Sequence, residues 1–512
     1  MEISIVKSAC INGTKSERIN VEVSLNNGLP YYNVVGLADS SIKESRERVR
    51  SAIKNSGFIW PNRKITVNLN PAWLNKSGSS FDLAIALGIL QASSQIPQDL
   101  DLSAWGELSL TGNIESVPAA LALTDALLFN NINSMADVEN GNTIFVIPEN
   151  AKNEIEDFIK NVEYYSNLKS LVETLKTNRV KQKKEISIKD NHVKNDLSDL
   201  NKFPIDIQAF AWRACQIAVA GGHHLLMQGA AGSGKSTLAR YSRYLLPELT
   251  PQENYKLALR YSIANLPLQL EELELGVLRE VHHSMTSAAI LGGSYKYPLG
   301  ELALANKGIL FLDEISLFPN DVINNLRASS ESGLVERKLH GELVLQEARY
   351  ILIATCNPCK CGNYFEESSC TCSDGDIVRY RQKFDNPFFD RISLFCNLLT
   401  LEKDKISETL AEREFDLSVY KTMVNRAREI QKLRFNTDQY VLNAWAPVDK
   451  IRNSLQCSRK NKTIFENIAS TFKLSIRSYQ NIWRLARTIA DLDGSENIEE
   501  NHIYEAFAYR RK

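Results

Sequence analysis

Apolar and polar positions along the first third of the chain predict both strands and helices. Residues 18–25 and 64–70, "RINVEVSL" and "KITVNLN", have the period-two or β-branched pattern of strands. Residues 40–57, "SSIKESRERVRSAIKNSG", predict a helix that stops at Gly57, and "NTIFVIPE" (142–149) predicts a buried strand. We therefore expect residues 1–175 to form a mixed α+β domain.

The middle of the chain alternates apolar strand patterns with helix patterns. "HHLLMQG" (223–229), "GILFLDEI" (308–315) and "RYILIATCNP" (349–358) predict buried strands, and "STLARYSRYL" predicts a helix after the first of them. Such alternation favours a mostly parallel sheet with helices on both faces. Residues 203–400 are therefore predicted to form an α/β core.

The remaining stretches differ in composition. Residues 176–202 are polar, charged and free of aromatic residues, which is typical of a linker. A solvated connector is favoured there over a DNA-binding tail, despite "RVKQKK". Residues 401–512 are strand-poor, and "SYQNIWRLARTIADL" has heptad-like apolar spacing. The chain is thus predicted to be an α/β multi-domain protein that ends in an all-helical domain.

Composition narrows the class of protein. The 512 residues are 44% hydrophobic and 24% charged, as in soluble multi-domain proteins, and the net charge of -1 confines any polyanion contact to local patches. The apolar run "LAIALGIL" is too short to cross a bilayer, and the first residues lack the order of a secretory signal. We therefore expect a cytoplasmic protein without membrane contact.

A phosphate-binding loop follows the first strand of the predicted core. "GAAGSGKS" fits the pattern G-x-x-x-x-G-K-[ST] between a strand and a helix, in which backbone N–H groups surround nucleotide phosphates. Lys235 would contact the outer phosphates and Ser236 would hold Mg²⁺. The predicted ATP-binding residues are Gly229, Ala230, Ala231, Gly232, Ser233, Gly234, Lys235, Ser236, Thr237 and Asp313.

Three more residues join Asp313 in a candidate site for hydrolysis. Asp313 and Glu314 end an apolar strand, where Asp313 would hold Mg²⁺ and Glu314 would activate water. Asn357 ends the next strand and would orient that water. Arg391 follows in "NPFFDRISLF" and would neutralise charge in the transition state, often from a neighbouring subunit. The order of the four along the chain strengthens each assignment.

A cysteine-rich insertion lies at residues 356–372. Cys359 and Cys361 form one C-x-C pair, and Cys370 and Cys372 form another. Four thiolates from two close pairs can surround one structural Zn²⁺. The alternative is four reduced cysteines on a mobile loop. Cys356 has a suitable spacing but is expected to be buried on its strand.

Together these motifs resemble the magnesium-chelatase-like AAA+ proteins of bacteria, and within them the ComM (YifB) group. The motifs are "GAAGSGKS", "GELALANKGILFLDEI", "ATCNPCKCG", "FFDRI" and "LSIRSYQNIWRLARTIADLDG", and the resemblance covers nearly the whole chain. It implies an AAA+ core at 203–400 and a helical lid at 401–512. It also implies that Asn357 is the sensor of its strand, Arg391 the arginine finger and Arg477 the second sensor arginine. Whether Arg477 serves its own nucleotide or a neighbour's stays open.

The same resemblance implies that residues 1–175 have a Lon-protease-like fold. Ser80, in "KSGSS", falls at the place of the protease nucleophile. A serine nucleophile needs an activating base, and that family uses a lysine. The matching stretch 113–123 contains no lysine, and the expected position is near Leu121. We therefore expect a non-proteolytic domain used in assembly or partner binding.

Candidate DNA contacts also come largely from the resemblance. Residues 333–350 predict a hairpin with Arg337, Lys338 and His340 near its tip, and related ring ATPases place such a hairpin in their central channel. Residues 281–298, including Lys296, resemble a second channel-side insertion. The neighbouring His282 and His283 are expected to pack or to contact backbone rather than to bind a metal.

The resemblance implies a hexameric ATPase that moves single-stranded or branched DNA. Its function would be helicase and branch-migration activity that helps incoming single strands to integrate during natural transformation, with a recombinase as a possible partner. The alternative is a chelatase-like or protein-remodelling ATPase without DNA translocation. The Lon-like domain favours the DNA motor, since the chelatase motor lacks it, and the missing lysine disfavours an ATP-dependent protease.

Overall fold

The computed structural model divides the chain into two compact units. Unit 1 contains residues 1–192 and 249–270, and unit 2 contains residues 193–248 and 271–512. The chain therefore passes between the units three times. The structure describes residues 2–37, 39–129, 143–177, 187–188, 208–268, 270–294, 297–339, 342–364, 370–384, 387–398, 416–435, 441–447, 450 and 457–511.

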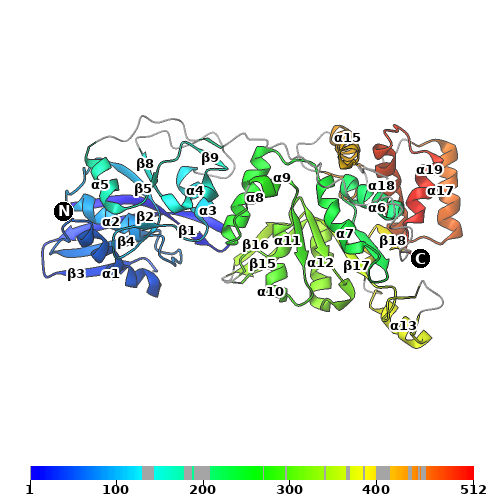
Figure 1. The fold of residues 1–512 in the computed structure, drawn as a ribbon, viewed down its shortest axis with the longest axis horizontal. Helices are drawn as coiled ribbons and strands as arrows, with labels where there is room; N and C mark the ends of the chain where they lie inside the picture. The colour runs from blue at the N-terminus through cyan, green and yellow to red at the C-terminus, as the bar shows by residue number, and fades with distance from the viewer. Residues whose placement is uncertain are drawn as a thin grey trace. The chain divides into compact units, whose positions relative to one another are not determined.

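Unit 1 is built on a mixed sheet of seven strands in the order β10-β8-β5-β1-β2-β4-β3 (Figure 1). The strands are β1 (Glu2–Asn12), β2 (Lys15–Asn26), β3 (Tyr31–Val35), β4 (Lys64–Asn70), β5 (Asp101–Ala104), β8 (Thr143–Pro148) and β10 (Tyr164–Tyr165). β1 and β2 form a long antiparallel hairpin, with Glu2 opposite Leu25. Every second residue of β2 from Ile19 to Leu25 is buried, so the predicted alternation directs one face of the hairpin to the core.

Helices cover the buried face of this sheet. The side chain of Asp39 caps the start of α1 (Ser40–Asn55). As predicted, the helix ends before Gly57, whose φ of 85° is incompatible with a right-handed helix. α2 (Asp82–Ala92) is buried along its whole length and packs on β1 and β2. The other elements of unit 1 are β6 (Glu107–Leu108), β7 (Ile114–Glu115), α3 (Ala120–Leu128), α4 (Lys152–Ile155), β9 (Ile159–Lys160), α5 (Leu168–Lys176) and β11 (Ser187–Ile188).

One helix from the middle of the sequence belongs to unit 1. α8 (Pro251–Ile263) lies within the stretch 203–400 but packs on α3. The hydroxyl of Tyr255 donates to the Asp125 carboxylate over 2.7 Å, and the Tyr255 ring packs edge-on against Phe129. Burial raises the pKa of Asp125 to about 6. These contacts attach a segment of the ATPase region to the N-terminal fold.

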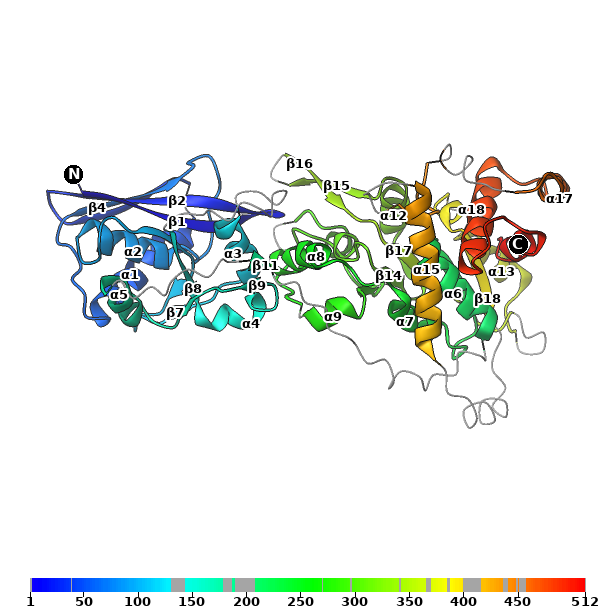
Figure 2. The ribbon, with the colours of Figure 1, turned by 90° about the horizontal axis from the view of Figure 1, so that it is seen from above.

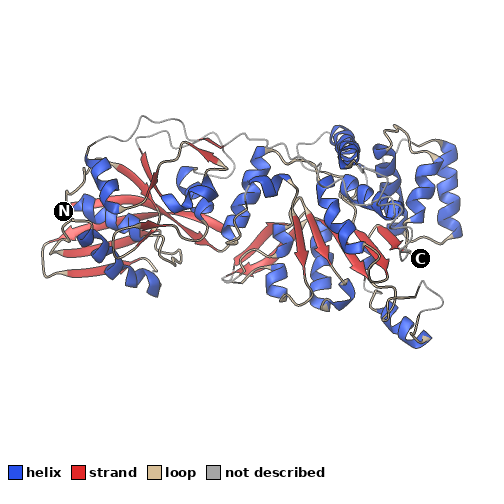
Figure 3. Ribbon diagram, viewed as in Figure 1, coloured by secondary structure: helices blue, strands red, loops and turns tan. Residues whose placement is uncertain are grey.

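Unit 2 contains the predicted parallel sheet. Its five strands run in the order β13-β14-β17-β12-β18 and pair in parallel throughout (Figure 3). They are β12 (Leu225–Gly229), β13 (Leu278–Val281), β14 (Ile309–Leu312), β17 (Ile351–Cys356) and β18 (Leu394–Leu398). β14 and β17 are buried at every position, which explains their unbroken apolar runs.

Helices flank this sheet, and a separate hairpin accompanies it. α6 (Ala209–Gly221) precedes β12, and α7 (Lys235–Tyr241) follows it. β15 (Leu334–Leu339) and β16 (Glu342–Glu347) pair antiparallel as the predicted hairpin. The remaining helices of the core are α9 (Leu270–Glu274), α10 (Ser287–Leu291), α11 (Glu301–Leu304), α12 (Asn320–Ser332) and α13 (Asp374–Gln382).

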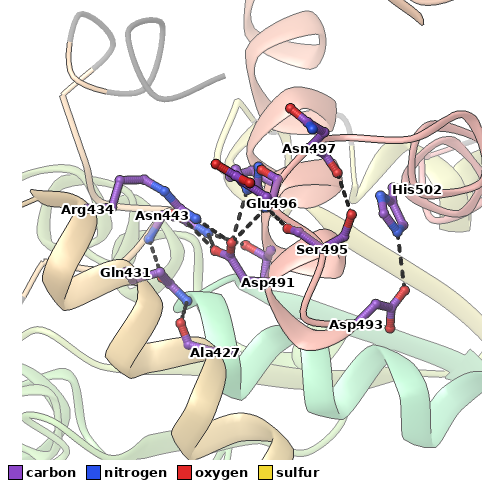
Figure 4. Close-up of polar contacts among 12 residues, drawn as sticks. Ala427, Gln431, Arg434, Asn443, Asp491, Asp493, Ser495, Glu496, Asn497 and His502 are labelled. Atoms are coloured by element: carbon purple, nitrogen blue, oxygen red, sulfur yellow. Dashed lines mark hydrogen bonds and ion pairs between the residues drawn. The ribbon is translucent and has the colours of Figure 1, made fainter. Parts of the chain in front are cut away.

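The last part of unit 2 is helical, as predicted. α15 (Leu417–Phe435), α17 (Arg459–Thr471), α18 (Ile476–Leu492) and α19 (Glu500–Ala508) form it, and α15 and α18 both pack on α6 (Figure 2). Asp491 of α18 is fully buried and accepts hydrogen bonds from Arg434, Arg487 and Asn443 (Figure 4). This charged network joins the helices to one another. Among the described residues, no helix combines the length and apolar composition needed to cross a membrane.

Candidate active site

The glycine loop between β12 and α7 has the conformation that its motif requires. Gly232 and Gly234 have positive φ angles of 78° and 89°, which glycine adopts without strain. The Lys235 ammonium donates to the carbonyl oxygens of Gly229 and Ala230, both at 2.6 Å. It therefore lies within the loop, and burial lowers its pKa. Bound phosphate oxygens would give this buried cation a negatively charged partner.

The two acids follow β14, beside the loop. The Ser236 hydroxyl donates to the Asp313 carboxylate over 3.3 Å, which joins the two predicted Mg²⁺ ligands. Glu314 is exposed and has a φ of 53°, an uncommon value for a residue other than glycine. Strained backbone of this kind persists only where its surroundings hold it. Hydroxyl and carboxylate oxygens at this place fit a Mg²⁺ ion that is shared with a nucleotide.

Thr355 of β17 holds both acids and was missed by the sequence analysis. Its hydroxyl donates to Asp313 over 2.5 Å and accepts from the backbone N–H of Glu314 over 3.0 Å. The available signal was a polar residue inside an otherwise apolar strand, two positions before Asn357. Asn357 itself follows β17, and its backbone carbonyl oxygen accepts a hydrogen bond from the Gln228 side chain, near the end of β12, over 3.3 Å. The structure thus brings the loop, the acid pair and Asn357 together at the carboxyl ends of the parallel strands.

The two predicted arginines lie together elsewhere in unit 2. Arg391 and Arg477 both donate to one oxygen of Glu331, Arg477 over 2.7 Å. Burial and the neighbouring Arg477 lower the pKa of Arg391. Both line a cavity of about 340 Å³, together with Arg349 and Arg484. Glu331 is the only carboxylate among the described residues of this lining, so the cavity suits an anion.

This cavity lies away from the glycine loop. β12 and β18 run parallel, with Leu225 opposite Leu394 and Gly229 opposite Leu398. Arg391 comes three residues before β18 begins, whereas the loop starts where β12 ends. A strand of five residues spans roughly 13 Å. The arginine pair and the glycine loop therefore lie at opposite ends of the parallel strands.

The four predicted zinc ligands cluster after β17. The sulfur atoms of Cys359, Cys361, Cys370 and Cys372 all lie within 4.8 Å of one another. Hydrogen bonds from the backbone N–H groups of Asn363 and Thr371 lower the pKa of Cys361 to about 5. Cys356 is buried on β17, as expected, and burial raises its pKa to about 12.

The predicted DNA contacts divide into three groups. Lys338 is exposed on β15. Arg337 is partly buried and donates to Asn325 over 3.1 Å. His340 and Lys296 lie outside the described residues. The ring centroids of His282 and His283 lie 4.1 Å apart.

Ser80 of unit 1 is buried rather than open to a substrate. Its hydroxyl donates to the backbone carbonyl of Ala9 over 3.2 Å. Leu121, at the place expected for the protease lysine, is buried in α3.

Three family models match the chain. The model described as "Magnesium chelatase, subunit ChlI" matches residues 200–406, and that of the same subunit's C-terminal part matches residues 417–510. A third, "Subunit ChlI of Mg-chelatase", matches residues 21–135. Because the third match lies in the N-terminal region, that region does not by itself separate the DNA motor from the chelatase-like alternative.

Two of the relatives described here match over the whole length, and one matches in part. YifB of Escherichia coli (strain K12) is 33% identical over 100% of this chain and 97% of that protein. Competence protein ComM of Haemophilus influenzae is 33% identical over 100% of this chain and 98% of that protein. The magnesium-chelatase 38 kDa subunit of Rhodobacter capsulatus is 25% identical over 54% of this chain and 77% of that protein. The parallel sheet, the glycine loop and these full-length matches show that the chain belongs to the ComM/YifB group of magnesium-chelatase-like AAA+ proteins, a family that implies ATPase activity.

Proposed function

We propose that this protein is a ring-forming ATP-driven motor that moves single-stranded or branched DNA. The observation that carries the proposal is the separation of the glycine loop from Arg391 and Arg477 by the length of a strand. A nucleotide bound in the loop lacks both arginines within its own subunit. A neighbouring subunit in a head-to-tail ring can supply them.

The pairing of the two arginines also bears on Arg477. Because Arg391 and Arg477 share Glu331, they belong to the same surface. We therefore assign both to the neighbour's nucleotide. The γ-phosphate would replace Glu331 as their anionic partner, and the free carboxylate would move aside. Hydrolysis then depends on contact between subunits, which lets ATP turnover drive movement around a ring.

The relatives favour DNA as the molecule that the motor moves. The name of one full-length relative, competence protein ComM, connects it with uptake of DNA, and family resemblance implies a hexamer. Lys338, Leu343 and Leu345 are exposed on the β15–β16 hairpin, where a cation and apolar side chains can contact backbone phosphates and bases. The function would be branch migration or unwinding in natural transformation, alongside a recombinase.

The direct test measures ATP turnover and particle mass. Forked DNA should stimulate hydrolysis, and ATP with DNA should convert the protein into a closed oligomer. Lys338→Ala should weaken the stimulation and leave turnover without DNA unchanged. Lys460→Ala, which removes an exposed cation on α17, is the matched control. A protein that stays monomeric with both ligands supplied would refute the proposal.

A chelatase-like or protein-remodelling ATPase is the second candidate. The partial likeness to the Rhodobacter capsulatus chelatase subunit and the chelatase model over residues 21–135 favour it. Under this alternative a folded protein, and not forked DNA, stimulates hydrolysis. The same turnover assay therefore separates the two.

A further inference from the structure

We propose that Cys359, Cys361, Cys370 and Cys372 bind one structural Zn²⁺, and that this ion positions Asn357 and the segment after Glu314 for ATP hydrolysis. The sulfur of Cys359 lies 3.3 Å from that of Cys361 and 3.9 Å from that of Cys370, and the sulfurs of Cys361 and Cys370 are 3.6 Å apart. A tetrahedral Zn²⁺ with bonds of about 2.3 Å places its sulfurs about 3.8 Å apart. The cluster therefore has the dimensions of a single tetrahedral ion.

A disulfide or an iron–sulfur cluster fits the geometry of the four cysteines less well than one metal ion does. A disulfide requires sulfurs at about 2.05 Å, and all four thiols are free. An iron–sulfur cluster puts several metal and sulfide atoms between its ligands, which holds the cysteine sulfurs farther apart than one ion does. The backbone N–H of Cys361 points to the Cys372 sulfur at 3.4 Å, a type of contact that supports a metal-bound thiolate.

The helix that follows the cluster needs such an anchor. α13 begins at Asp374, and its N-cap Ser373, which forms a capping box with Asp376, comes directly after Cys372. None of its nine residues is buried. A helix this short is marginal in water without tertiary packing. A metal bound one residue before the cap would fix the end of α13 that apolar packing leaves unsupported.

The other end of α13 contacts the catalytic region. The Tyr380 hydroxyl donates to the Ser316 hydroxyl over 3.3 Å, and the Lys383 ammonium lies 3.4 Å from the Ser316 carbonyl oxygen. Ser316 comes two residues after Glu314. At the cluster itself, Cys359 comes two residues after Asn357. The ion would therefore close a short connection between the water-orienting amide and the segment that carries the activating acid.

The role of the ion would be positional rather than chemical. Four protein ligands leave no open coordination position for water or substrate. Loss of the ion should leave the glycine loop, and therefore ATP binding, intact. It should lower turnover, because small displacements of catalytic groups cost about 10- to 100-fold in rate.

The metal itself is tested on the purified full-length chain, without reference to ATP or DNA. Elemental analysis should find one zinc per chain. Co²⁺ in its place should give the visible bands of a tetrahedral tetrathiolate complex. Cys370→Ser and Cys372→Ser should each lose the zinc, whereas Cys457→Ser, outside the cluster, should keep it. Protein that is free of zinc, or that holds an iron cluster, overturns the assignment.

The positional role rests on the proposed ATPase activity and is tested separately. A zinc-selective chelator in excess Mg²⁺ should lower kcat about 10-fold or more with little change in KM for ATP, and added Zn²⁺ should restore it. Tyr380→Phe removes the hydroxyl contacts with Ser316 and with the backbone of Asn357, so it should lower kcat while zinc content stays at one. Unchanged kcat after zinc release would overturn the positional role, and an inactive protein that still binds zinc would instead contradict the proposed function.

Discussion

Thr355 shows how much of the active site depends on one hydroxyl. It bonds to Asp313 and to the backbone of Glu314, so it orients the proposed Mg²⁺ ligand and the proposed activating acid together. Hydrogen bonds to charged groups contribute about 1.5–3 kcal/mol, which corresponds to roughly 10- to 100-fold in rate. Thr355 therefore acts through its two neighbours and not on the substrate.

We predict that Thr355→Val lowers kcat by roughly 10- to 100-fold and raises the Mg²⁺ concentration needed for half-maximal turnover. Valine keeps the shape of threonine but cannot bond to either acid. A titration of ATPase rate against Mg²⁺ measures both effects. Thr355→Ser keeps the hydroxyl and should retain most activity; equal loss in both variants would refute the role of the hydroxyl.

Glu314 allows a second prediction at the residue scale. Glu314→Gln should bind ATP with unchanged affinity and lose at least about 100-fold in turnover, because the amide cannot accept the proton of the attacking water. Nucleotide binding and phosphate release, measured on the same preparation, separate the two steps. Glu466→Gln, an exposed change on α17, is the control. Retained turnover in Glu314→Gln would show that another base activates the water.

At the scale of elements, the helical domain is held to the core by polar contacts as well as apolar packing. Arg428 and Gln431 of α15 donate to carbonyl oxygens at the end of α6, and His223 bonds to Thr488 of α18 over 2.8 Å. Burial lowers the pKa of His223 to about 3, so this contact uses the neutral ring. The helix that carries Arg477 is thereby fixed to the strand that leads into the glycine loop.

The buried network around Asp491 should dominate the stability of this domain. Asp491→Asn leaves Arg434 and Arg487 without their shared counter-charge, and breaking a buried pair costs about 3–5 kcal/mol. Denaturant unfolding followed by tryptophan fluorescence measures the change. Asp493→Asn removes a carboxylate that is 34% exposed and should cost about 1 kcal/mol or less. An equal loss of unfolding free energy in the two variants would show that burial of the carboxylate does not determine its contribution to stability.

For the whole molecule, the decisive property is that the proposed ATPase residues are divided between the two ends of the parallel strands. The glycine loop and acids lie where the strands end, and Arg391 and Arg477 lie where the strands begin. Unit 1 is joined to this machinery by three passages of the chain, one of which carries α8 out of the ATPase region. Nucleotide-dependent movement in unit 2 therefore has covalent routes to unit 1.

Mixing two inactive variants tests the shared site. Lys235→Ala and Arg391→Ala should each abolish turnover. Their equimolar mixture should recover activity, because on the order of a quarter of randomly formed seams pair an intact loop with an intact arginine. ATP turnover against mixing ratio, with each variant alone as the control, measures this. No recovery in a mixture that demonstrably co-assembles would place Arg391 outside the neighbour's site.

The sequence alone identified features whose signal is local. The glycine loop, the acids after an apolar strand and the two C-x-C pairs occupy short segments, and the parallel sheet followed from alternating apolar runs. Folding decided the rest: Glu331 meets Arg391 and Arg477 across 60 and 146 positions, Thr355 meets Asp313 across 42, and α8 packs in unit 1. Such partners share no spacing or pattern along the chain, because only the pairing of distant strands and helices brings them together.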